Sequence, residues 1–217
     1  GVGVFPDDAR EPELLLQHSQ HALVQSAQIG RDVTLYQQLE ARAHGEVEAA
    51  LRFESELRRG LSEAQFELYY QPIMAVADAR VVGFEALLRW RHPERGVLRP
   101  AAFLDQAATI GVLDALESFA LESALEQLAE WSRQGKTRLK VAVNVSARRF
   151  QHDDLVDEVM DACSRFGVAP DRLDLEITEN TALRDLPHAT RQIAALHKVG
   201  VRVALDDFGT GYSSLAN

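Results

Sequence analysis

The sequence predicts an α/β fold in which a mainly parallel sheet curves into a barrel. From residue 66 onward, short strand-like runs alternate with amphipathic helical stretches, and this rhythm is typical of βα units. Within a run such as Val141–Val145, valines face one way while Ala142 and Asn144 face the other. Strands of this kind suit a barrel whose bulky side chains pack under outer helices and whose interior is crowded.

The elements follow in order along the chain. Strands at 66–73 and 80–87 are separated by a turn at 76–79, so we expect a hairpin. His92, next to Pro93, is expected to have a structural role in a turn. Gly111, Gly167 and Gly200 are helix end signals. Further strands are expected at 139–145, 172–178 and 201–206, and helices at 101–110, 114–134, 153–166 and 185–199.

The first sixty residues have a different organisation. Strands are expected at 1–5 and 33–36, on either side of a helix that runs to about Gln28. Residues 37–59 are rich in strong helix formers and contain no proline. A solvated connector helix is favoured there over a coiled-coil pair, because the seven-residue repeat is short and made mostly of alanine.

Composition limits the partners and the compartment. The 217 residues carry a net charge of −10, which argues against a nucleic-acid polymer or an anionic membrane as the main partner. The single cysteine, Cys163, excludes an internal disulfide and fits a reducing compartment. No apolar run is long enough to span a bilayer. We expect a cytoplasmic protein, in which any membrane tether would lie upstream of Gly1.

Polar side chains near the carboxyl ends of the strands form the candidate site. Glu85, Asn144, Glu176 and Asp206 share the small-residue face of their strands, and Asp207 follows at once. In a barrel these ends meet at one mouth. Carboxylates gathered there need raised pKa values or cations, and oxygen ligands suit Mg²⁺ or Mn²⁺. The alternative is a set of separately solvated strand ends.

The same residues carry a family resemblance. Four motifs occur in order, namely Glu85-Ala86-Leu87, Asn144-Val145-Ser146, Glu176-Ile177-Thr178-Glu179 and Asp206-Asp207-Phe208-Gly209. From about Glu56 to Asn217 the chain resembles the EAL family of cyclic di-GMP phosphodiesterases. The resemblance implies a TIM-like barrel whose first strand is antiparallel. It also implies hydrolysis of cyclic di-GMP to linear pGpG by two Mg²⁺ or Mn²⁺ ions, which activate water and neutralise the phosphodiester.

The resemblance also implies residue roles. Gln71 and Arg89 match contacts to the substrate. Glu179 matches a glutamate that steadies the catalytic loop beginning at Phe208, and Asp207 matches a catalytic carboxylate serving the second metal. Ala108 departs from the family, which often has glutamate there. The implied metal ligands are Glu85, Asn144, Glu176, Asp206 and Asp207.

Residues 1–36 resemble the last part of a GGDEF domain, the fold of diguanylate cyclases. Ser19 and Gln20 replace the usual Ala-Asp pair, and Ala27 replaces a phosphate-holding lysine. This piece is therefore expected to be a degenerate remnant. The predicted organisation is a GGDEF remnant at 1–36, a linker helix at 37–59 and an EAL-like barrel domain at 60–217.

Two functions from different classes fit these observations. The first is the phosphodiesterase, favoured because the motifs with metal ligands are intact; the second is an inactive receptor that binds cyclic di-GMP. A homodimer through the barrel domain or the linker helix is expected, with sensory domains upstream. We also expect the chain to be a truncated piece of a longer protein and inactive alone, because the family's catalytic lysine would lie beyond Asn217.

Overall fold

The computed structural model describes residues 1–28 and 33–206 of the chain. The chain divides into two compact units, Gly1–Glu56 and Leu57–Asn217, and each is described by itself. Within the described ranges, no helix is long and apolar enough to cross a membrane.

The first unit contains helix α1 (Pro12–Gln28) and the beginning of helix α2 (Tyr36–Ser62). The strands predicted at 1–5 and 33–36 are wrong. Val2 and Leu35 form only an isolated parallel bridge, with the Val2 N–H donating to Thr34 O at 3.0 Å. Helix α2 already begins at Tyr36, so little extended chain is left to pair. The helix predicted at 37–59 is confirmed and extends to Ser62.

The second unit is built on one sheet with the order β1-β2-β4-β5-β6, and β3 pairs with β2 beside this path. β1 and β2 are antiparallel, whereas the pairs β2–β4, β4–β5 and β5–β6 are parallel. The predicted hairpin and the parallel strands that follow it are therefore confirmed. The strands are β1 (Phe66–Met74), β2 (Val81–His92), β3 (Gly96–Leu98), β4 (Lys140–Asn144), β5 (Leu173–Thr178) and β6 (Arg202–Asp206).

The helices of this unit connect the strands. One predicted helix is divided in the structure, and one helix that was not predicted is present. The stretch predicted at 101–110 is a 3₁₀ turn, η1, followed by α3. The helix predicted at 185–199 is confirmed as α8, and the short helix α7 before it was not predicted. The helical elements are η1 (Pro100–Ala102), α3 (Leu104–Thr109), α4 (Leu113–Arg133), α5 (Ala147–Phe150), α6 (Leu155–Phe166), η2 (Pro170–Arg172), α7 (Glu179–Arg184) and α8 (Leu186–Lys198).

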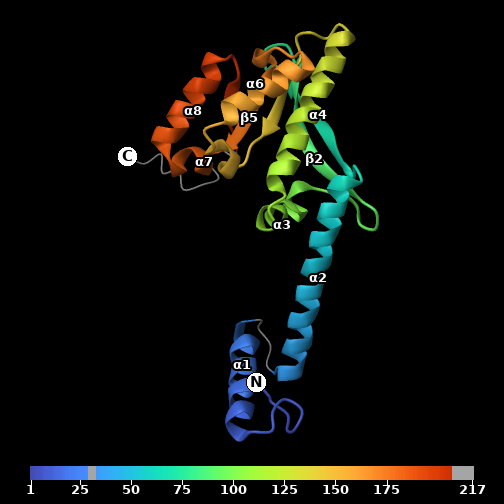
Figure 1. The fold of residues 1–217 in the computed structure, drawn as a ribbon, viewed down its shortest axis with the longest axis vertical. Helices are drawn as coiled ribbons and strands as arrows, with labels where there is room; N and C mark the ends of the chain where they lie inside the picture. Colours follow the sequence, from blue (N-terminus) through green and yellow to red (C-terminus); the bar gives the residue numbers. More distant parts are fainter. Residues whose placement is uncertain (29–32, 207–217) are drawn as a thin grey trace. The chain divides into compact units, whose positions relative to one another are not determined.

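One face of the sheet is covered by α4, α6 and α8 (Figure 1). The apolar side chains of the strands point into this layer, because alternate residues of a strand face opposite sides. Val143 and Leu175 of the sheet belong to the same buried cluster as Leu125, Val159 and Leu196 of the helices. The opposite face is thereby left to the small and polar residues of the same strands, among them the candidate site.

Strand β2 runs five residues past the predicted end, to His92, and a tight turn returns the chain into β3. Arg89 is consequently on the strand. The Nδ1 atom of His92 accepts hydrogen bonds from the backbone N–H groups of Glu94 and Arg95, at 3.1 and 3.2 Å. The structural role predicted for His92 fits this geometry, since its ring, which is 3% exposed, holds the β2–β3 turn.

Strands β2 and β4 approach each other closely at Gly83. A Cβ atom built there would lie 2.8 Å from the backbone oxygen of Lys140, a distance that real Cβ atoms essentially never show. Gly83 pairs with Lys140 in the parallel register, two residues before Glu85. The absence of a side chain thus sets the spacing of the two strands just below the candidate site.

The core under α4 should dominate stability. Replacing the fully buried Leu125 by alanine should lower the free energy of unfolding by about 2–5 kcal/mol, because it removes apolar contacts and leaves a cavity. Leu183→Ala on α7 is the matched control, because that side chain is 53% exposed; its effect should stay within about 0.5 kcal/mol. Urea unfolding measures both, and equal losses would contradict the packing described.

Candidate active site at the strand ends

The strand register places the predicted site residues on one face of the sheet. Gln71 lies opposite Glu85 in the antiparallel pair, and Asn144 lies beside Glu176 in the parallel pair. Asp206 pairs with Thr178, two residues beyond Glu176, so its side chain falls on the same face as Glu176. The sites predicted from alternating residues are brought together on neighbouring strands.

Two of these residues touch directly. The Nδ2 atom of Asn144 donates a hydrogen bond of 2.9 Å to Oε1 of Glu85 and so links β4 to β2. Burial, together with repulsion from Glu85, Asp206 and Asp174, raises the pKa of the Glu176 carboxyl to about 7. The arrangement therefore concentrates negative charge in a partly desolvated place.

One carboxylate of this face is compensated by the protein itself. Arg202 donates from Nε to Oδ1 of Asp174 at 2.8 Å, and its Nη2 donates to the other carboxylate oxygen. The paired residues lie in adjacent positions of β5 and β6, and the Asp174 side chain is 14% exposed. This ion pair lies on the same face as Glu176, two residues further from the carboxyl end of β5, and we call it the floor of the site.

The donor set fits a hard divalent cation. Carboxylate and amide oxygens are ligands that Mg²⁺ and Mn²⁺ accept, and a cation would relieve the repulsion that raises the pKa of Glu176. Among the residues that the structure describes, however, no three His, Cys, Asp or Glu side chains gather closely enough to hold a metal ion. Asp207 lies outside the described residues, and Asn144 is an amide. The predicted ligands that the structure describes are neighbours on one face of the sheet.

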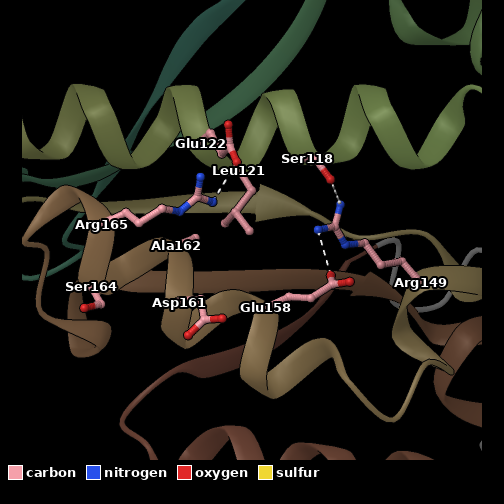
Figure 2. A pocket seen from close by; sticks show the side chains of 9 residues that line it. All are labelled: Ser118, Leu121, Glu122, Arg149, Glu158, Asp161, Ala162, Ser164 and Arg165. Atoms are coloured by element: carbon pink, nitrogen blue, oxygen red, sulfur yellow. Dashed lines mark hydrogen bonds and ion pairs between the residues drawn. The ribbon is translucent and has the colours of Figure 1, made fainter.

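A cavity of about 520 Å³ opens beside these residues. Glu85, Asn144 and Asp206 contribute to its wall, and so does Ala108, at the position where the resemblance expects glutamate. Apolar side chains of β2, α3 and α4 also line it. A second hollow of about 580 Å³ lies between α4 and α6 on the outer layer, lined by none of the predicted site residues (Figure 2). The 520 Å³ cavity is therefore the candidate binding site.

The other predicted site residues that the structure describes do not line this cavity. Arg89 donates to the Leu88 carbonyl at 2.8 Å, and its guanidinium carbon lies 5.5 Å from the centre of the Tyr69 ring. Glu179 is the first residue of α7, directly after β5. Asp207 and the predicted loop beginning at Phe208 lie outside the described residues.

Glu117 of α4 is a residue that the sequence reasoning missed. It lines the cavity, and its Oε1 atom accepts a hydrogen bond of 2.7 Å from the backbone N–H of Ser146. Its Oε2 atom is buried without a hydrogen-bond partner in the described part of the chain. A single glutamate on an amphipathic helix carries no sequence signal, since most such residues are solvated.

Comparison with known proteins identifies the family. The profile of the EAL domain matches residues 54–217. Because this match covers most of the chain, the protein belongs to the EAL domain family. The resemblance carried by the four motifs is confirmed at this level, whereas residues before 54 lie outside the match.

Curated relatives extend over the whole chain. The cyclic di-GMP phosphodiesterase NbdA of Pseudomonas aeruginosa is 41% identical over 218 residues, which cover 100% of this chain and 27% of NbdA. The bifunctional diguanylate cyclase/cyclic di-GMP phosphodiesterase MucR of the same organism is 34% identical, over 99% of this chain and 31% of MucR. The chain thus spans about a third or less of these relatives.

Solved structures share the fold. The MucR phosphodiesterase in complex with cyclic di-GMP superposes with a TM-score of 0.71 at 39% identity, over 74% of this chain and 65% of that one. The EAL domain of FimX from Xanthomonas citri, also in complex with cyclic di-GMP, gives a TM-score of 0.68 at 25% identity, over 77% of this chain and 65% of that one. The chain therefore has the α/β EAL fold, with an antiparallel first pair followed by parallel strands.

The buried carboxyl of Glu117 should make stability depend on pH. Burial raises its pKa in the folded protein above the ordinary value of 4.5. Its contribution to stability is therefore fully present below the unfolded pKa and is lost as the pH rises through the folded pKa. Glutamine does not titrate, so Glu117→Gln should gain stability relative to the wild type as the pH rises from 4.5. Urea unfolding over a pH series measures this difference, and a constant difference would contradict the assignment.

Proposed function

We propose that the protein is a metal-dependent phosphodiesterase that hydrolyses cyclic di-GMP to linear pGpG. The observation that carries the proposal is the gathering of Glu85, Asn144, Glu176 and Asp206 on one face of the sheet, three of them in the wall of a cavity. Membership of a family whose relatives NbdA and MucR are called cyclic di-GMP phosphodiesterases supports the choice of substrate.

In this proposal the chain's own residues bind and orient the substrate. Arg89 lies on the site face of β2 and supplies a positive charge for a phosphate, and Gln71, opposite Glu85, supplies an amide. Glu85, Asn144, Glu176, Asp206 and Asp207 would hold Mg²⁺ or Mn²⁺. When bound, such ions neutralise a phosphodiester and activate water. Asp207 and Glu179 keep their predicted roles at the second metal and at the catalytic loop.

A second candidate is a receptor that binds cyclic di-GMP without hydrolysing it. Ala108, at a cavity position where the family often has glutamate, favours this reading. The intact set of oxygen donors favours the enzyme, because a receptor needs no metal ligands. Turnover with Mg²⁺ or Mn²⁺ separates the two candidates.

The proposed setting is bacterial signalling in the cytoplasm. Residues 1–36 would be the end of a degenerate GGDEF domain and 37–59 a linker to the EAL-like domain at 60–217; the match to a bifunctional cyclase/phosphodiesterase, which extends over 99% of the chain, supports this organisation. Sensory domains upstream and a homodimer formed through the EAL domain or α2 complete the proposal.

Loss of single ligands should abolish turnover. In the whole natural protein, Glu85→Ala or Asp206→Ala should remove hydrolysis of cyclic di-GMP in Mg²⁺ or Mn²⁺ while the fold survives, because each deletes a charged oxygen donor. Circular dichroism checks the fold, and chromatography of pGpG measures turnover. Glu130→Ala on the exposed side of α4, where Glu130 pairs with Arg133, is the control and should keep wild-type turnover.

The result is informative in either direction. Hydrolysis that survives in Glu85→Ala or Asp206→Ala would exclude that residue from the metal site. A wild-type protein that binds cyclic di-GMP and yields no pGpG with either metal would replace the enzyme by the receptor.

A further inference from the structure

The short helix that follows β4 is held by two adjacent residues of α4. Glu117 accepts the backbone N–H of Ser146 at 2.7 Å. Ser146 in turn caps α5, since its Oγ atom accepts the backbone N–H of Arg149 at 3.2 Å. The carboxylate of Glu117 therefore fixes the residue at which strand β4 turns into α5.

Arg149 ties the other end of this turn to the same helix. Its Nη1 donates to Oγ of Ser118 at 3.2 Å, and its Nη2 donates to Oε2 of Glu158 at 3.0 Å. Figure 2 shows the guanidinium between these two partners, which come from α4 and α6. The Arg149 side chain is 12% exposed and its bond to Ser118 is partly buried, whereas Glu158 is 45% exposed. We call Glu117 and Ser118, with the bonds that they make to Ser146 and Arg149, the α4 clamp.

The clamped turn begins two residues after Asn144. The intervening Val145 donates its N–H to the carbonyl of Glu176 at 2.8 Å, so the chain is anchored to β5 on one side and to α4 on the other. Asn144 itself donates its amide to Glu85. The two residues that follow Asn144 are thus held by backbone hydrogen bonds to β5 and to α4.

Holding the Ser146 backbone does not by itself require an acidic residue at position 117. A neutral acceptor would satisfy the Ser146 N–H, whereas a carboxylate with a buried oxygen that lacks a partner among the described residues costs desolvation energy. Such a cost is typical of sites where function holds a group in place. Glu117 also lines the cavity that contains Glu85 and Asp206.

We propose that the α4 clamp is a positioning device for Asn144, and that Glu117 is its central positioning residue. It acts through the Ser146 backbone to keep the Asn144 oxygen available to a divalent cation while the Asn144 amide bonds Glu85. The proposal rests on the proposed metal-binding function of these strand ends. Contacts that orient metal ligands in this way typically govern metal affinity.

The test compares two substitutions of Glu117 with one substitution of Glu122, a second glutamate of α4. Glu117→Leu removes the acceptor, and Glu117→Gln keeps an oxygen for the Ser146 N–H. Glu122→Leu is the control, because Glu122 lies on α4, ion-pairs with Arg165 at 2.7 Å in the hollow of Figure 2 and makes no bond to the clamped turn. Calorimetric titration with Mn²⁺ and with Mg²⁺ gives the affinity of each variant without substrate.

Glu117→Leu should weaken metal binding by about 10- to 100-fold, as loss of a ligand-orienting contact typically does. Glu117→Gln should restore the affinity to within a few-fold of the wild type, and Glu122→Leu should not change it. Hydrogen exchange of the Ser146 amide gives a second readout. The amide should exchange slowly in the wild type and in Glu117→Gln, and rapidly in Glu117→Leu.

A folded Glu117→Leu protein that binds metal as tightly as the wild type would overturn the proposal. Rapid hydrogen exchange of the Ser146 amide in the wild type would overturn it too, and that measurement needs no variant. A wild-type protein without metal affinity would overturn it as well. The proposed function can fail separately from the clamp. If the variants show the expected differences in metal affinity but the wild type does not hydrolyse cyclic di-GMP, the clamp stands and only the phosphodiesterase proposal is contradicted.

Discussion

The candidate site depends on the register between neighbouring strands. In a strand, side chains alternate between two faces, so a shift of one residue in β4 would turn Asn144 into the helix layer and bring Val143 or Val145 into the site. The register is held because Val141 and Val143 are buried under α4 and α6, where a polar residue would be costly. The apolar core on one side of the sheet thereby decides which oxygen atoms meet on the other side.

The clustered carboxylates of the site lower the stability of the folded protein. Glu176 lies among other carboxylates and is partly desolvated, and both effects favour its neutral form. The protein compensates Asp174 with Arg202 and orients Asn144 through Glu85 and the turn after β4. Charge is therefore neutralised at the floor of the site and left at the strand ends, which is the distribution expected of a place prepared for a cationic ligand.

Much of this arrangement is visible in the sequence, because local patterns report it. Alternation in Val141–Val145 and the turn at 76–79 predicted a shared polar face and an antiparallel first pair, and the register confirms both. Contacts across the fold leave no such pattern. Glu117 and Ser146 are 29 residues apart, and nothing in either segment indicates their bond. Strand β3 was not predicted because three residues are too few to show an alternating pattern. The prediction of strands at 1–5 and 33–36 was wrong because α2 begins directly after Leu35.

The close approach of the strands at Gly83 has an evolutionary consequence. Residues at the strand ends lie beside a cavity, so a lineage could exchange one of them and still keep a folded domain. Gly83 has no such freedom, because any side chain would meet the Lys140 backbone and separate β2 from β4. Relatives of this chain should therefore keep the glycine more consistently than the acids. That glycine would then mark common ancestry, and the acids at the strand ends would vary with the use that each relative makes of the cavity.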